Sequence, residues 1–176
     1  MIDLVAFSDD AHHSWVRRLG FHQFLPYKHL HVVLGGDEEK NLKAVKDRSV
    51  DVLFPESAKG KDSLHWRRSG LNQVLLRLAK KNRVAIGFSL CAVLDHKGEK
   101  RGLVLGRMMQ NVFLCRKYEV GMVLCSFAHD LWGLRSASDL ASFGRVIGMT
   151  PGEVKNALHF ERKNNGVRIL SAHGKC

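Results

Sequence analysis

The chain has 176 residues, of which 45% are hydrophobic and 26% charged, with only 3 Pro. This is the size and composition of a soluble globular protein, and we expect residues 1–176 to form a single domain. The Lys and Arg residues number 28 and the Asp and Glu residues 17, which leaves a net charge of +11. Such an excess usually indicates a polyanionic partner, either nucleic acid or an anionic membrane, although a basic proteome would also produce it.

Apolar runs are too short for a membrane protein. No run approaches the ~20 apolar residues of a spanning helix. The N-terminal stretch becomes acidic at Asp9 and Asp10, before a signal peptide could form. The cysteines are widely spaced and form no Cys-x-x-Cys pair. We therefore expect a reducing, cytoplasmic location and no membrane partner.

The first third of the chain alternates short apolar runs with amphipathic segments. In chain order the predicted elements are a strand at 2–7, a helix capped by Ser8 or Asp9 that reaches Leu19, a strand at 29–34, a helix at 37–45 and a strand at 50–54. Gly35 and Gly36 end the second strand and Pro55 ends the third. Acidic residues at 37–39 suit the first turn of a helix.

The periodicity is clearer from residue 69 onward. The predicted elements are a helix at 69–81, a strand at 84–90, a long helix that ends near Tyr118, a strand at 120–125, helices that open at Ser136 and Thr150, and a short strand at 167–170. The 69–81 segment has apolar residues at i, i+3, i+4 and i+7, which form one helical stripe. Ser136 with Asp139, and Thr150 with Glu153, have the spacing of capping boxes.

The alternation of strand and helix predicts an α/β fold with parallel strand pairing. The 84–90 run is almost wholly apolar, as expected for a strand that is covered on both faces. The chain has five clear strands and six or seven in all. That number is low for a complete eight-unit barrel, which takes about 250 residues.

Motifs for catalysis are weak. His29 and His31 could point to the same side of a strand and offer two metal ligands, but no third ligand stands at another strand end. Ser126, His129 and Asp130 are too close in sequence to form a catalytic triad. The chain has no Walker phosphate loop and no Gly-x-Gly-x-x-Gly motif. We therefore expect neither catalytic residues nor a metal in this chain. The roles of four histidines stay open: His12, His13, His29 and His31.

Basic residues gather after predicted strands and at helix starts. They are Arg67 and Arg68 (which follow His65 and Trp66), Lys97, Lys100, Arg101, Arg107 and Arg135. Loops that follow parallel strands emerge at one face of an α/β fold, so these residues can converge. The planar Arg side chain suits phosphate oxygens, and helix N-termini add N–H donors. For each residue taken alone, a solvated surface charge is the competing interpretation.

The loop after the 120–125 strand contains mixed polar residues. Asp139 is interpreted as a helix cap and not as a base, and Trp132 as a loop anchor and not as a stacking platform. His129 is either a phosphate contact or a packed loop residue. Arg135 is predicted to be a phosphate contact or a structural anchor.

Several short motifs occur in a distinctive order. They are GLNQVL at 70–75, VAIGFS at 84–89, Arg101 opening a helix that ends in RKY at 116–118, VLCSFA at 123–128, LRS at 134–136 and GMT at 148–150. In this order and spacing they resemble ribonuclease P protein component 3, a family of archaea and eukaryotes. The resemblance covers residues 3–157, most densely from residue 69, and the short chain is similar to the archaeal form.

The resemblance implies a distorted TIM-barrel-like (β/α) fold, related to the polymerase-and-histidinol-phosphatase type. Those phosphoesterases begin with His-x-His on the first strand. This chain has Asp3-Leu4-Val5 there, so the resemblance implies that the metal site is absent. The RNA contacts that it implies are Arg101, Arg107 and Arg135, with Lys97 and Lys100 nearby. Arg67, Arg68 and His129 join this predicted RNA-binding set from the loop analysis.

The resemblance also implies a function and partners. The family supplies an RNA-binding protein subunit of ribonuclease P, the endonuclease that removes the 5′ leader from precursor tRNA. The RNA subunit carries the magnesium-dependent cleavage, so the isolated chain is expected to be inactive and to hold no cofactor. The implied partners are ribonuclease P RNA, precursor tRNA, other ribonuclease P proteins and a Pop5-like subunit, with which it would form a heterotetramer of two copies each.

Two alternatives stay open. One is a barrel-type metal-dependent phosphoesterase that uses His29, His31, His129 and Asp130. The other is a protein–protein scaffold whose basic face is incidental. Stoichiometric metal, or phosphatase activity without RNA, would support the phosphoesterase. Partner binding without salt-dependent RNA affinity would support the scaffold.

Overall fold

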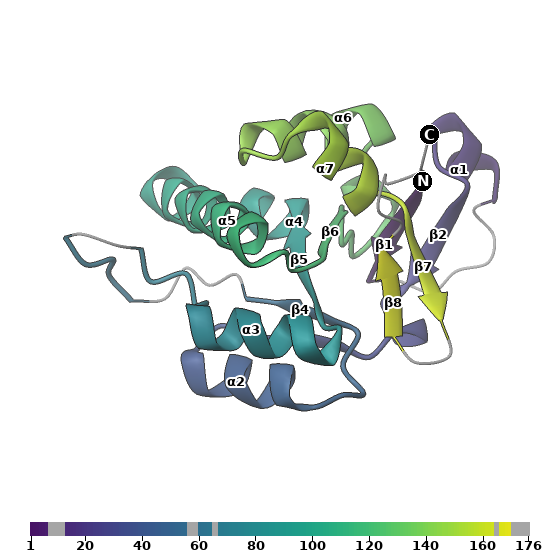
Figure 1. The fold of residues 1–176 in the computed structure, drawn as a ribbon. Coiled ribbons are helices and arrows are strands. Elements are labelled where there is room, and N and C mark those ends of the chain that lie inside the picture. The colour runs from purple at the N-terminus through teal and green to yellow at the C-terminus, as the bar shows by residue number, and fades with distance from the viewer. Residues whose placement is uncertain (7–12, 56–59, 65–66, 164–165, 170–176) are drawn as a thin grey trace.

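The computed structural model describes residues 1–6, 13–55, 60–64, 67–163 and 166–169, and strands alternate with helices over most of them (Figure 1). In chain order the elements are β1 (Ile2–Val5), α1 (His13–Arg18), β2 (Gln23–Pro26), the 3-10 helix η2 (Tyr27–His29), β3 (Val32–Leu34), α2 (Glu38–Lys46), β4 (Val52–Phe54), α3 (Gln73–Asn82), β5 (Ala85–Ser89), α4 (Leu90–Leu94), α5 (Gly98–Tyr118), β6 (Met122–Cys125), the 3-10 helix η3 (Leu131–Gly133), α6 (Ala137–Val146), α7 (Pro151–Ala157), β7 (Phe160–Lys163) and β8 (Gly166–Ile169).

The parallel strands follow one another around a distorted barrel. β3, β4, β5 and β6 form one parallel sheet in that order, and β1 pairs with β2 in another. The two sheets meet beyond the end of β6, where the Phe127 N–H donates to the Leu4 carbonyl at 3.0 Å and the Ala6 N–H donates to the Ala128 carbonyl at 2.8 Å. β6 therefore lies beside β1, which is the closure that a barrel needs. This confirms the predicted TIM-barrel-like α/β fold.

Strand side chains alternate between two cores. Val52 and Phe54 of β4 point into a cluster inside the barrel with Leu4 of β1, whereas Leu53 packs outward against the helices. This period of two is what a strand buried on both faces requires. Gly87 on β5 lacks a side chain because a Cβ there would collide with the Phe54 ring. Both faces of the sheet are thus apolar, as the 84–90 run predicts.

Helices cover the outside of the strands (Figure 1). α3 lies between α2 and α5, and α6 and α7 lie together on the other side of α5. The predicted capping boxes of α6 and α7 are both confirmed, with the Ser136 and Thr150 side chains as caps. Within the described ranges, no helix is both long and apolar enough to cross a membrane.

The structure corrects three predicted elements. The strand predicted at 29–34 begins only at Val32, because η2 and a short bend occupy the residues before it. β2 went unpredicted because only two large apolar residues, Phe24 and Leu25, mark it before Pro26. α4 was not predicted, and the strand predicted at 84–90 overlaps it only at Leu90. It forms because Ser89 caps it, with Oγ accepting from the Ala92 N–H at 3.2 Å. The predicted caps Ser8 and Asp9 lie outside the described residues.

Candidate nucleic-acid interface

The carboxyl ends of β5 and β6 bring two connecting segments together. β5 leads directly into α4 and then α5, and β6 leads into a loop that ends at the cap of α6. The Cys91 N–H donates to the Ser126 carbonyl at 3.0 Å, so α4 and this loop are joined at the edge of the sheet. This is the edge at which parallel α/β folds place their binding residues.

Ser126 is a structural residue. The fully buried Asp3 carboxyl accepts from the Ser126 N–H at 2.7 Å and from its hydroxyl at 2.6 Å. Burial raises the pKa of Asp3 to about 7, although these hydrogen bonds by themselves would lower it. Because Ser126 is itself buried and bonded to Asp3, it forms no nucleophilic triad with the exposed His129 and Asp130.

Exposed lysines stand at the start of α5. Lys97 is the residue before the helix and Lys100 lies in its first turn, and both side chains are exposed. Cations at a helix N-terminus oppose the helix dipole, so these two lysines do not help α5 to form. The N-terminal N–H groups also favour anions. This end of α5 therefore suits a negatively charged partner.

Arg101 holds the neighbouring turn in place. Its Nε donates to the His96 carbonyl at 2.7 Å and to the Val93 carbonyl at 3.1 Å, and Nη2 donates to the Leu94 carbonyl at 3.4 Å. These carbonyls belong to the last turn of α4 and to the segment that follows it. Arg101 is half-buried and positions this turn, and its contact with RNA stays a prediction.

Arg107 lies inside the protein and not at its surface. Its side chain is 2% exposed, and Nη2 lies 2.7 Å from Oδ1 of Asp62. Nη2 also donates to the Gly60 carbonyl at 2.8 Å. Burial would raise the pKa of Asp62, but hydrogen bonds from the Arg68 N–H and the Arg107 side chain, together with the charges of Arg107 and Arg67, lower it. The predicted RNA contact at Arg107 is thus corrected, because a buried charge needs a buried partner and Asp62 is that partner.

The segment around Arg67 lies along α5. Gln110 of α5 accepts from the Arg67 N–H at 3.0 Å and donates to its carbonyl at 2.8 Å. The Arg67 and Arg68 side chains are exposed. Arg67 also lies 3.5 Å from the Asp62 carboxylate and covers Gly106, where a Cβ would collide with it. The preceding His65 and Trp66 lie outside the described residues.

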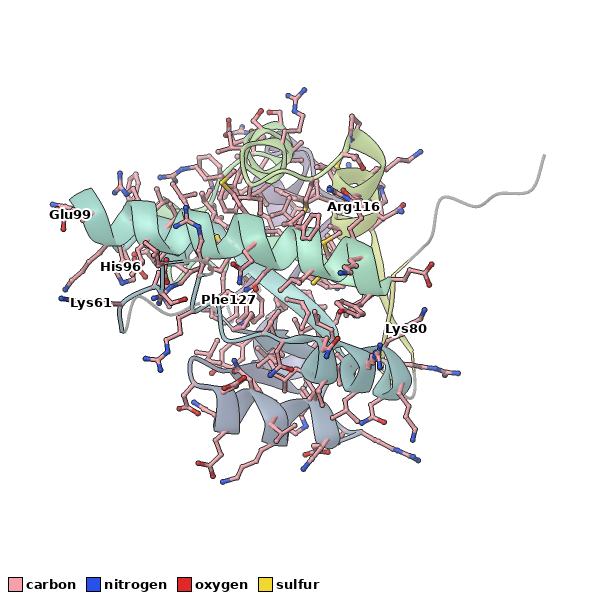
Figure 2. All side chains as sticks on the ribbon, turned by 60° about the vertical axis from the view of Figure 1, so that its left-hand side comes forward. Lys61, Lys80, His96, Glu99, Arg116 and Phe127 are labelled. Carbon is pink, nitrogen blue, oxygen red and sulfur yellow. The ribbon has the colours of Figure 1, made fainter. Side chains whose placement is uncertain are left out.

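The exposed basic residues lie towards one end of α5. Lys100 is two turns before Arg107 on the same helical face, about 10 Å along the axis. Arg107 is bonded to Asp62, so the exposed neighbouring residue Lys61 lies on the same side of α5. Figure 2 shows Lys61 at the end of α5 that carries Glu99, while Arg116 lies at the other end. We call these exposed residues the basic surface: Lys61, Arg67, Arg68, Lys97 and Lys100.

Arg135 closes the loop after β6. Its Nη1 donates to the Trp132 carbonyl at 2.9 Å and to the Leu134 carbonyl at 2.7 Å, and the residue is half-buried. This geometry supports the structural-anchor interpretation. Trp132 is 90% exposed, so its prediction as a loop anchor is wrong. Asp139 is confirmed as a cap, since it accepts from the Ser136 N–H at 3.1 Å.

His29 and His31 do not approach His129 as the phosphoesterase alternative requires. His31 precedes β3, at the opposite end of the strands from the loop that bears His129, and its Nδ1 lies 2.9 Å from the Ser49 hydroxyl. Among the described residues, neither belongs to a group of three metal-binding side chains. His12 and the side chain of His13 lie outside the described part of the chain.

One group of side chains went unnoticed in the sequence. Cys91 and Asp95 on α4 lie beside His129, with their ligand atoms within 4.8 Å of one another. The signal was the spacing of Cys91 and Asp95, which puts both on one helical face. The sequence did not predict the group, because the helix that holds Cys91 and Asp95 was itself not predicted and Asp95 was assigned to a polar loop.

Comparison with known proteins identifies relatives of this chain. The family model described as RNase P subunit p30 matches residues 5–163. Ribonuclease P protein component 3 of Methanosarcina mazei is 38% identical over 128 residues, which cover 72% of this chain and 50% of the relative. The Methanococcus vannielii protein of that name is 30% identical over 141 residues, covering 74% and 58%. The chain spans about half the length of these curated relatives.

A solved structure shares the fold. A chain in the cryo-EM structure of archaeal ribonuclease P with mature tRNA superposes with a TM-score of 0.64 at 20% identity. The match covers 89% of this chain and 76% of that chain. The family model's match over residues 5–163 begins at the last residue of β1 and includes β2 to β6, α5 and the loop that carries Arg135. This chain belongs to the RNase P subunit p30 family.

Proposed function

We propose that this chain is an RNA-binding protein subunit of ribonuclease P, the enzyme that removes the 5′ leader from precursor tRNA. Membership of the RNase P subunit p30 family supports this role. So does the net charge of +11, which suits a polyanionic partner. The fold is also shared with a chain of an archaeal ribonuclease P structure that contains mature tRNA.

The observation that carries the proposal is the basic surface. Lys97 and Lys100 stand at a helix N-terminus where they disfavour the helix, and Arg67 and Arg68 are held on the flank of the same helix. An RNA phosphate would accept hydrogen bonds from these side chains and from the first N–H groups of α5. Arg101 and Arg135 act behind this surface by holding the loops at the sheet edge.

The proposed division of labour leaves cleavage to the RNA. The magnesium ions that cleavage needs would lie at the RNA subunit, and this chain would bind and position RNA. Its partners would be ribonuclease P RNA, precursor tRNA, other ribonuclease P proteins and a Pop5-like subunit in a heterotetramer. We infer a cytoplasmic location from the wide spacing of the cysteines, which suits a reducing compartment.

Reconstitution tests the proposal. Ribonuclease P RNA and the remaining protein subunits are assembled with and without this chain, and cleavage of precursor tRNA is followed at limiting magnesium. We expect the chain to increase cleavage, and to cleave nothing when it is incubated with precursor tRNA alone. Equal cleavage with and without the chain would contradict the proposal. Phosphatase activity of the isolated chain would favour the phosphoesterase alternative.

A further inference from the structure

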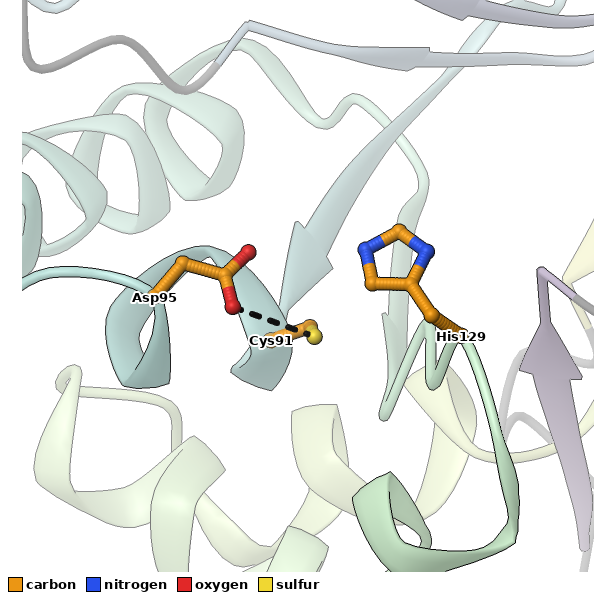
Figure 3. Close-up of side chains that lie close together, drawn as sticks. All are labelled: Cys91, Asp95 and His129. Carbon is orange, nitrogen blue, oxygen red and sulfur yellow. Dashed lines mark hydrogen bonds between the residues drawn. The ribbon is translucent and has the colours of Figure 1, made fainter.

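We propose that Cys91, Asp95 and His129 form a zinc-binding site at the edge of the sheet where β5 and β6 end. One thiol, one carboxylate and one imidazole converge there, and all three are groups that zinc takes as ligands. Figure 3 shows Asp95 and His129 approaching Cys91 from two separate segments. The proposed site goes beyond the RNA-binding role and does not depend on it.

The distances match a tetrahedral zinc centre. With Zn–S of about 2.3 Å and Zn–O of about 2.1 Å, tetrahedral geometry separates sulfur and oxygen by about 3.6 Å. Sγ of Cys91 and Oδ1 of Asp95 are 3.7 Å apart. The imidazole lies within 4.8 Å of both, so a movement of about 1 Å brings it into range. His129 is exposed, and its ring packs edge-on against the Phe127 ring with centroids 6.3 Å apart.

The backbone under the site is held at several points. Cys91 and Asp95 lie one helical turn apart on α4, where the Asp95 N–H donates to the Cys91 carbonyl at 2.9 Å. Arg101 donates to the Val93 carbonyl in the last turn of this helix and to the His96 carbonyl just beyond it. The bond from the Cys91 N–H to the Ser126 carbonyl ties α4 to the segment that carries His129. The two ligand-bearing segments therefore keep a fixed separation, as a preformed metal site requires.

Phe127 fixes the direction of the His129 segment. Its backbone has φ of 49°, a left-handed conformation that costs a residue with a side chain about 1–2 kcal/mol. The ring is buried against Phe54 and Tyr27, with centroids 5.0 and 5.9 Å away. This packing offsets the backbone strain, and strain that is held in this way is characteristic of functional sites.

The local charge also suits a cation. In the metal-free protein the Cys91 thiol donates its hydrogen to Asp95. Burial and the charges of Asp95 and Asp130 raise the pKa of Cys91, and Arg135 opposes them only in part. Zinc would take the place of the thiol proton, which passes to water, and the thiolate and carboxylate would then balance the two charges of the ion.

Three protein ligands leave one coordination position open. Zinc sites of this kind complete their tetrahedron with an oxygen donor, usually water. In this chain the charge of Arg135 acts at Cys91, so a cationic side chain lies near the proposed site. An oxygen ligand from solvent or from a bound phosphate group can fill the open position.

Metal titration of the full chain tests the proposal. The protein is stripped with a chelator under reducing conditions, and zinc binding is measured by calorimetry. We expect one zinc per chain, and more than about 100-fold weaker binding in Cys91→Ala and in His129→Ala, since loss of an outer-shell partner alone costs up to that much. Cobalt, used as a spectroscopic substitute for zinc, should show a thiolate-to-metal absorption band that Cys91→Ala abolishes.

Matched controls separate this site from other thiols and histidines. Cys176→Ser removes a cysteine that lies outside the described residues, and His29→Ala removes an exposed histidine of η2. Both should bind zinc as the parent chain does. The proposal is overturned if Cys91→Ala and His129→Ala bind zinc as tightly as the parent, or if the cobalt band survives in Cys91→Ala. Binding only at millimolar zinc, equal in all variants, would overturn it as well.

Discussion

Asp3 and Ser126 are 123 positions apart in the chain, and their paired hydrogen bonds join the start of β1 to the end of β6. Asp62 and Arg107 join the 60–64 segment to α5 in the same way. Both are buried or partly buried polar pairs, so each partner needs the other. At the scale of single residues, these pairs position the sheet edge and the flank of the basic surface.

Asp3 should make stability depend on pH. Its pKa is about 7 in the folded protein, against 3.8 for an unperturbed Asp, so the folded state keeps the proton longer than the unfolded state. The contribution to stability is therefore complete below about pH 4 and is lost as pH rises through about 7. Denaturant unfolding at pH 5 and pH 8 should show the free energy of unfolding falling in the parent chain by at most about 3 kcal/mol, because about two pH units of this window lie below the folded pKa and each is worth about 1.4 kcal/mol.

Asp3→Asn is the informative variant, because an amide can keep the contacts to Ser126 and does not ionise. We expect it to remove most of the fall between pH 5 and pH 8. Asp139→Asn is the control, since the Ser136 hydrogen bonds lower the pKa of Asp139 and it stays ionised throughout that window. An unchanged fall in Asp3→Asn would show that other groups cause it.

Arg107→Met should destabilise the protein by about 3 kcal/mol, because it removes the buried ionic partner of Asp62 and leaves only the longer pair with the exposed Arg67. Chemical unfolding measures the loss. Arg77→Met, which removes an exposed Arg from α3, should change stability by less than about 0.5 kcal/mol. Similar losses in both variants would mean that the Arg107–Asp62 pair contributes little.

At the scale of elements, α4 sets the position of the residues that follow β5 at the sheet edge. This helix has only five residues, so its stability comes from its ends: the Ser89 cap at the start and the Arg101 side chain at the finish. α5 begins with exposed lysines, and in its last turn Arg116 pairs with Glu153 of α7 at 2.7 Å. The last turn of α5 is thus joined to α7 by an ion pair, whereas its first turn carries exposed cations.

Arg101→Ala should loosen α4. Loss of charge-assisted hydrogen bonds to the His96 and Val93 carbonyls removes about 1.5–3 kcal/mol of local stabilisation. Hydrogen–deuterium exchange followed by mass spectrometry should show faster exchange over residues 90–97. Lys100→Ala, one position earlier and exposed, should leave the exchange of this segment unchanged. Equal exchange in Arg101→Ala and the parent chain would remove Arg101 from this positioning role.

At the scale of the whole molecule, charge is the dominant property. The net charge of +11 gives the chain a general attraction for nucleic acid, and the fold gathers part of it on the basic surface at one end of α5. Side chains there come from two segments, 60–68 and 97–100, which only the packing against α5 brings together.

The double variant Lys97→Ala/Lys100→Ala should weaken binding to ribonuclease P RNA and reduce its salt dependence. Each phosphate contact that is lost lowers the slope of log affinity against log salt by about 0.7–0.9, so two lysines account for about 1.4–1.8. Binding is measured over a range of salt concentrations. Lys46→Ala/Arg48→Ala, which removes the same charge at the end of α2, is the control. The same loss of slope in both variants would show that only net charge matters.

The sequence by itself determined the α/β class, the buried strand at β5, the capped starts of α6 and α7, and the strong positive charge. These follow from local signals: hydrophobic period, capping residues and composition. The ordered motifs also indicated the family. Short strands such as β2 were not predicted, because their few apolar residues resemble the sequence of a loop.

Tertiary structure decided what each basic side chain does. Arg107 and Lys100 are both cationic residues of one helical face, yet one is buried against Asp62 and the other is exposed. The pairing of Asp3 with Ser126 and the meeting of Cys91 with His129 likewise involve residues far apart in the chain. Local sequence specifies backbone conformation. The burial and partner of a side chain depend on which distant segments pack against it, and that is settled only when the sheet closes.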